Sequence, residues 1–167
     1  MRFRLEQRYN RPPAEVAAAF VDPALLAHLG TRSDLGSPRL LERDDAGDVV
    51  AMRVRYRFSG RLSGGVTRVV DPDRLTWVEE SELDRRTSTT TFRIVPDHYA
   101  NLLRCAGTIS VAPDADGQGA TRVIEADLKV TVPFVGGSVE RAIVGGLRDH
   151  AAVEARVVGE WLAAPRP

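Results

Sequence analysis

Two polar residues, His150 and Glu154, stand one helical turn apart in the last long segment of the chain. At this spacing both side chains lie on the same face of a helix. A carboxylate that orients an imidazole lets the ring offer a hydrogen bond or a proton to a bound molecule. The two side chains can also hydrogen-bond to each other within the core or hold a fixed water. The spacing therefore defines a candidate site and leaves both interpretations open.

The segment that carries this pair, Ser138–Leu162, has the longest helical pattern in the sequence. At about 100° per residue its apolar side chains share one face, with the polar pair at the centre of that stripe and arginines opposite. We predict one continuous helix with Ser138 as its N-cap. Gly145 and Gly146 in the middle either thin the helix wall beside a ligand or permit close packing of a sheet.

The rest of the chain predicts the sheet that this helix must pack against. Residues 2–9 alternate as a half-buried strand, and residues 14–29 form two short helices separated by Asp22-Pro23. Six further strands with period two are predicted at residues 39–43, 50–58, 75–83, 87–95, 102–111 and 122–132. Residues 61–71 form either an extra strand or a loop. We expect an α+β helix-grip fold, with a seven-stranded curved antiparallel sheet wrapped around the C-terminal helix.

Composition limits the classes of partner. The chain has 23 basic and 23 acidic residues, so no net charge favours nucleic acid or an anionic membrane. No apolar run approaches the roughly 18 residues of a membrane span, so we expect no stable membrane insertion. A single cysteine and an N-terminus without an apolar core favour a cytoplasmic location. The length fits one domain, residues 1–164, with a tail at 165–167.

The alternation of each strand assigns its inward side chains, which outline a cavity. Apolar walls with a few converging polar groups are typical of small-molecule sites. The predicted ligand-binding residues are Tyr56, Phe58, Trp77, Glu79, Ser88, Thr90, Phe92, Cys105, Leu147, His150 and Glu154. Glu79 faces inward only if Trp77 does, because a reversed alternation would turn Val78 inward instead. An isolated buried carboxylate is costly, so both arrangements stay open.

Other chemistry-bearing residues have simpler interpretations. We interpret Cys105 as a small core residue rather than a nucleophile, since no histidine is placed beside it. His28 and His98 are expected at the surface. No metal-binding or nucleotide-binding motif occurs, so we expect no metal and no cofactor. The row Arg53, Arg55 and Arg57 is expected to pair with carboxylates of neighbouring strands, the run 79–82 among them.

Several phrases of the sequence resemble the START-like superfamily, also called SRPBCC or the birch-pollen-allergen fold. They are the opening strand followed by Pro-Pro-Ala-Glu-Val, the Asp22-Pro23 helix start, and the stretches 69–77, 119–122 and 132–140. The last stretch resembles an uncharacterised branch of that superfamily. The resemblance implies a hydrophobic cavity between sheet and C-terminal helix. It implies no single activity, because members include lipid carriers, receptors, polyketide cyclases and aromatases.

Three functions are consistent with these observations. The leading hypothesis is a non-enzymatic binder or carrier of a small hydrophobic ligand that is lipid-like, isoprenoid or polyketide-like. The first alternative is a polyketide cyclase or aromatase-type enzyme that uses His150 and Glu154 as its acid and base. The second is a protein-interaction module with a filled core and an exposed apolar patch. The sequence assigns no oligomeric state.

Overall fold

The computed structural model of the chain describes residues 1–32, 36–58, 67, 71–134 and 136–165. Most of residues 61–71, which the sequence assigns to a strand or a loop, lie outside this set. The elements are β1 (Arg2–Tyr9), α1 (Pro13–Ala19), α2 (Pro23–Gly30), β2 (Arg39–Asp45), β3 (Val49–Arg57), the 3-10 helix η2 (Pro72–Arg74), β4 (Thr76–Asp84), β5 (Thr89–Pro96), β6 (Leu103–Pro113), β7 (Ala120–Val130) and α3 (Gly136–Ala163). Their order confirms the predicted strand, helix pair, strands and long helix.

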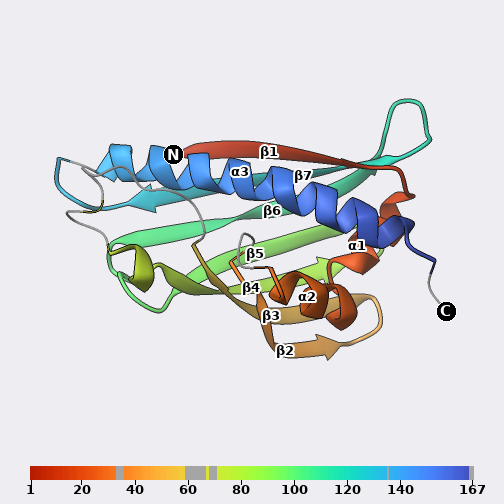
Figure 1. The fold of residues 1–167 in the computed structure, drawn as a ribbon, viewed down its shortest axis with the longest axis horizontal. Helices are drawn as coiled ribbons and strands as arrows, with labels where there is room; N and C mark the ends of the chain where they lie inside the picture. The colour runs from red at the N-terminus through yellow and green to blue at the C-terminus, as the bar shows by residue number, and fades with distance from the viewer. Residues whose placement is uncertain (33–35, 59–66, 68–70, 135, 166–167) are drawn as a thin grey trace.

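The described strands form one antiparallel sheet in the order β1-β7-β6-β5-β4-β3-β2. Among them, only the β1–β7 pairing joins strands that are distant in sequence, and the other neighbours are consecutive along the chain. Figure 1 shows α3 running along one face of the sheet beside β1 and β7, with α1 and α2 near one end of α3. This arrangement is the predicted helix-grip fold.

The start of α3 differs from the sequence prediction. The helix begins at Gly136, two residues before Ser138, so the assignment of Ser138 as N-cap is wrong. The Gly136 N–H donates to the carbonyl of Val132 at 3.0 Å. A Cβ at Gly136 would lie 2.5 Å from the carbonyl oxygen of Val130, so the chain passes close to the end of β7 here. The Ser138 hydroxyl instead accepts a hydrogen bond from Arg141 at 3.1 Å.

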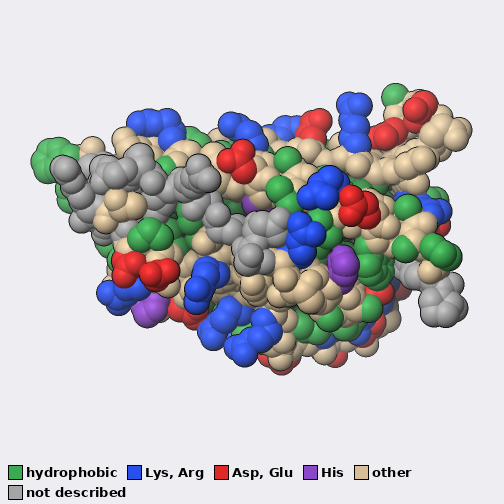
Figure 2. Space-filling model, in the orientation of Figure 1, with side chains coloured by type: hydrophobic (Ala, Val, Ile, Leu, Met, Phe, Trp, Pro, Cys, Tyr) green, Lys and Arg blue, Asp and Glu red, His purple; other side chains and the backbone are tan. Residues whose placement is uncertain are grey.

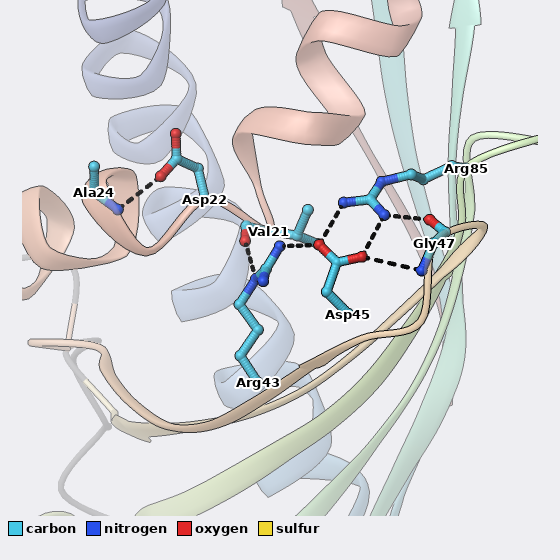
Figure 3. A network of polar contacts seen from close by, with 7 residues as sticks. All are labelled: Val21, Asp22, Ala24, Arg43, Asp45, Gly47 and Arg85. Carbon is cyan, nitrogen blue, oxygen red and sulfur yellow. Dashed lines mark hydrogen bonds and ion pairs between the residues drawn. The ribbon is translucent and has the colours of Figure 1, made fainter.

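Polar contacts on the outside hold the turns in place. Asp45, at the end of β2, accepts hydrogen bonds from Arg43 at 2.6 Å and from Arg85 at 2.6 and 2.9 Å (Figure 3). Arg43 also donates to the carbonyl of Val21 at 3.0 Å. These contacts tie the β2–β3 turn to the junction between α1 and α2 and to the β4–β5 turn. The two arginines hold the pKa of the Asp45 carboxyl well below its usual range.

Charged side chains on the outer face of the sheet form ion pairs with one another. Arg53 lies 3.4 Å from Glu80 and 3.3 Å from Glu42, and Arg93 lies 2.6 Å from Glu80. The predicted pairing of Arg53 with the acidic run of β4 is therefore confirmed. Figure 2, which views the molecule from the side of α3 and α2, shows both basic and acidic side chains on that face as well. Exposed pairs of this kind contribute little to stability.

Gly107 lets β6 and β7 approach closely. A Cβ at this position would lie 2.1 Å from the carbonyl oxygen of Glu125 and 2.7 Å from the Cα of Ala126. We expect Gly107→Ala to lower the free energy of unfolding by about 1–3 kcal/mol, because backbone atoms must move. Urea denaturation measures the change. The matched control is Gly145→Ala, where nothing lies within 4 Å and helix propensity favours alanine. Equal effects of the two substitutions would contradict the prediction.

Candidate ligand-binding cavity

A cavity lies between α3 and the inner face of the sheet, with α1 and α2 at one end. Its volume is about 200 Å³. Ligand pockets for drug-sized molecules usually measure about 300–1,000 Å³, so this cavity fits a compact ligand. Its walls are mostly apolar side chains from β1, β3–β7 and the three α-helices, among them Phe3, Leu25, Ile109, Leu128 and Ile143.

All but one of the predicted ligand-binding residues line this cavity. They are Tyr56, Phe58, Trp77, Glu79, Thr90, Phe92, Cys105, Leu147, His150 and Glu154. Gly146 of α3 also lines the cavity. Ser88 does not, and its assignment to the site is corrected. Its φ of 51° places it in the turn before β5, so the period-two count does not extend to it.

The centre of the cavity wall holds a buried network that the sequence analysis missed. Arg122 of β7 donates to the side-chain oxygen of Gln7 and, at 3.3 Å, to Glu154. Gln7 in turn donates to Glu154 at 2.9 Å and to the carbonyl of Ala151 at 2.8 Å. The Arg122 guanidinium also lies over the ring of Phe20, 3.8 Å from its centroid. This network fixes β1, β7 and α3 to one another.

A signal for Arg122 exists in the sequence. Arg122 has the same parity as Ile124 and Leu128, which face inward along β7, so period two places its side chain inward as well. Its partner across the β1–β7 ladder is Gln7, which the same alternation turns inward. The sequence analysis did not bring these two residues together.

Glu154 is held as an ion. Burial by itself raises the pKa of this carboxyl, but His150, Arg122 and Gln7 outweigh burial and lower the pKa to about 2. The closest approach of the His150 ring nitrogen Nε2 to Glu154 is 3.8 Å. The side chains of Arg122 and Glu154 are only 9% and 12% exposed. At neutral pH Glu154 is therefore a charge partner for Arg122 rather than a proton donor.

Glu79 is the second carboxyl group of the cavity and has a different environment. Trp77, Glu79 and Ser81 all line the cavity. The observed alternation of β4 is therefore the one that turns Trp77 and Glu79 inward, and not the one that turns Val78 inward. No hydrogen bond or ion pair of Glu79 occurs within the part of the chain that the structure describes. Burial, which exceeds the opposing effect of Arg122, raises its pKa to about 7. Among the described residues, Glu79 is thus an unpaired acid facing the cavity.

Aromatic and sulfur groups complete the surroundings of Glu79. The rings of Tyr56 and Trp77, cross-strand neighbours on β3 and β4, stack with centroids 6.0 Å apart at 17°. Burial raises the pKa of the Tyr56 hydroxyl well above its ordinary value. Burial likewise raises the pKa of Cys105 to about 11, so its thiol stays protonated and is a poor nucleophile. The interpretation of Cys105 as a small buried residue agrees with this environment.

The raised pKa of Glu79 predicts a pH dependence of stability. Between about pH 4.5 and pH 7 the folded chain binds more protons at Glu79 than the unfolded chain, so stability falls as pH rises through this window. Glu79→Gln should remove this loss, which amounts to roughly 2–3 kcal/mol. Urea denaturation at pH 5 and pH 8 measures it. The variant should be more stable than the parent at pH 8. If the variant loses as much stability as the parent between pH 5 and pH 8, the prediction is contradicted.

The described residues contain no group of three or more His, Cys, Asp or Glu side chains placed to hold a metal ion. Among the helices of that same part of the chain, none is both long and apolar enough to cross a membrane. His28 and His98 are exposed, and His98 lies 3.5 Å from a guanidinium nitrogen of Arg74. The polar groups of interest for a ligand are therefore those of the cavity.

A curved antiparallel sheet that grips a long C-terminal helix defines the START-like class of proteins, and this chain has that fold. The chain matches the family described as "Protein of unknown function (DUF2505)" over residues 4–162 and belongs to that family. No curated protein sequence matches the chain.

Solved structures show the same fold. A protein from Thermus thermophilus is 19% identical, with a TM-score of 0.65 over 97% of both chains. A START superfamily protein from Mycobacterium smegmatis is 13% identical, with a TM-score of 0.64 over 97% of this chain and 99% of the other. The Zhui aromatase/cyclase from Streptomyces sp. R1128 is 12% identical, with a TM-score of 0.61 over 97% of this chain and 93% of the other. At these identities the likeness concerns the fold alone.

Proposed function

We propose that the chain binds a small, largely apolar ligand in the cavity between the sheet and α3. The observation that carries the proposal is the cavity itself, about 200 Å³ in volume, with apolar walls and a few polar side chains. An interaction module with a filled core would not keep such a space. Native proteins fill their interiors to a density near that of organic crystals, so a cavity of this size is a feature to be explained.

The state of Glu154 argues against His150 and Glu154 as an acid–base pair. A general acid or base works best with a pKa near the operating pH, whereas the pKa of Glu154 is about 2. This carboxylate is also engaged by Arg122 and Gln7. His150 and Glu154 therefore fit a structural and ligand-orienting role better than the cyclase-type role. If a turnover assay with an aromatic polyketide detects activity and His150→Ala abolishes it, the catalytic alternative replaces this proposal.

Blocking the cavity tests the proposal directly. Leu147 lines the cavity, and a tryptophan there should occupy part of its volume. We expect Leu147→Trp to weaken binding of the small neutral fluorescent probe 2-naphthol by about tenfold or more, which corresponds to about 1.4 kcal/mol. The control is Val95→Trp on the outer face of β5, where the parent side chain is 40% exposed. Equal probe affinity in the two variants would place the ligand elsewhere.

Native mass spectrometry identifies the natural ligand. The protein is purified without denaturation, and a co-purified molecule appears as an added mass that is lost on denaturation. We expect this added mass for the parent chain and its reduction for Leu147→Trp. A cavity that accepts neither a cellular molecule nor the probe would overturn the proposal.

A further inference from the structure

The charged side chains that line the cavity include one carboxyl group without a partner among the described residues. Those that line its walls are Glu79 from β4, Arg122 from β7, and His150 and Glu154 from α3, while the exposed Arg57 lines it from the end of β3. Arg122 is already committed, since it donates to Gln7 and Glu154. Its charge is matched by the ionised Glu154. Within the described residues, Glu79 remains as a carboxyl group without a partner.

An unpaired carboxyl group in an apolar cavity distinguishes ligands by charge. Ionised Glu79 costs free energy in the empty site, because no hydrogen bond or ion pair from the described residues replaces water. A cationic ligand removes that cost, and its attraction to the carboxylate is strong where water is excluded. An anionic ligand would meet two carboxylates and an inner arginine that already has partners, so within the described lining it would depend on the exposed Arg57 at the end of β3. A neutral apolar ligand would leave Glu79 protonated and gain only from burial.

The side chains beside Glu79 fit the body of such a ligand. Trp77 lies two residues away on the same face of β4, and Tyr56 stacks on Trp77 from β3. Ile94 is the cross-strand neighbour of Glu79 on β5 and also lines the cavity. Aromatic rings attract ammonium groups and pack well against flat apolar bodies. At about 200 Å³ the cavity suits a body on the order of ten non-hydrogen atoms at protein packing density.

We propose that the ligand is a compact organic amine, whose ammonium group pairs with Glu79 while its aromatic or branched apolar body lies against Trp77 and Tyr56. The inference rests on the proposed ligand-binding function and specifies its ligand class. It assigns Glu79 the role of selecting charge, and it excludes fatty acids and other carboxylates as preferred ligands. His150 and Glu154, linked to Arg122, form the polar part of the wall on α3.

Three ligands of nearly equal size test the proposal: 2-phenylethylamine, 2-phenylethanol and phenylacetate. Isothermal titration calorimetry at pH 8 with the full chain measures the three affinities. We expect the amine to bind about tenfold or more tightly than the alcohol, and phenylacetate to bind more weakly than both. The amine affinity should rise between pH 6 and pH 8, because Glu79 ionises in this range while Glu154 is already ionised.

Glu79→Gln provides the decisive variant. It should remove the preference for the amine and leave 2-phenylethanol binding within about twofold, which also shows that the variant is folded. The control is Glu80→Gln, one residue away on the outer face, which should leave the preference intact. Equal binding of amine and alcohol to the parent chain overturns the amine proposal and leaves the proposed function standing. If 2-naphthol also fails to bind, the proposed function itself falls.

Discussion

Arg122→Met is expected to lower the free energy of unfolding by about 3–5 kcal/mol, because it leaves the ionised Glu154 buried without its cation. The side-chain oxygen of Gln7 would lose the hydrogen bond from Arg122 at the same time. Methionine preserves much of the side-chain volume, so the expected effect comes from lost charge and hydrogen bonds rather than from a cavity. Urea denaturation at pH 7 measures the change.

A double variant separates the charge effect from the packing effect. Arg122→Met with Glu154→Leu removes both members of the pair, so most of the lost stability should return. Arg93→Met is the surface control: it breaks an exposed pair with Glu80 and should change stability by less than about 1 kcal/mol. If the single variant Arg122→Met is as stable as the Arg93→Met control, the network does not hold the sheet to α3 in the manner described.

The loss of stability in Arg122→Met should also depend on pH. The pKa of Glu154 is depressed in the folded chain, so its contribution is present above the unfolded pKa of about 4.3 and is lost as pH falls toward about 2. Removing Arg122 raises the folded pKa of Glu154 and so removes this contribution. The parent and the variant should therefore approach each other in stability at low pH.

The fold could be predicted because both periodicities are local properties of the sequence. Alternation in β3, from Val50 to Tyr56, defines its inward face without knowledge of its neighbours, and the stripe on α3 does the same. The same alternation placed Trp77 and Glu79 at the cavity once the phase of β4 was known. These residues follow from a pattern that each strand carries by itself.

Other parts of the site depend on which strands become neighbours. Gln7 and Arg122 meet only because β1 pairs with β7 across a separation of 115 residues, and no local pattern encodes that pairing. Ser88 was assigned because the predicted strand began at Thr87, two residues before β5, and so included a turn residue with positive φ. α3 begins at Gly136, where the backbone passes close to Val130, and so does not follow the capping preference of Ser138. The prediction of the site was therefore limited by two things that local patterns do not give: which strands pair, and where each strand or helix begins.

Leu128→Ala is expected to lower the free energy of unfolding by about 2–5 kcal/mol. Leu128 is 1% exposed and lies on the inner face of β7, where it lines the cavity together with Ile143 and Leu147 of α3. Truncation removes apolar burial and adds to a space that already exists, so the surrounding side chains have little means of closing it. The matched control is Leu41→Ala on β2, where the parent side chain is 39% exposed and the change should stay within about 0.5 kcal/mol.

The same substitution links stability to ligand choice. The enlarged cavity should admit a bulkier amine, so 2-naphthylethylamine should gain affinity relative to 2-phenylethylamine in Leu128→Ala, measured by calorimetry on folded protein. Bound ligand should then recover part of the lost stability, since binding to the folded state shifts the unfolding equilibrium. A destabilised variant with an unchanged order of affinities would show that Leu128 supports the fold without shaping the space that the ligand occupies.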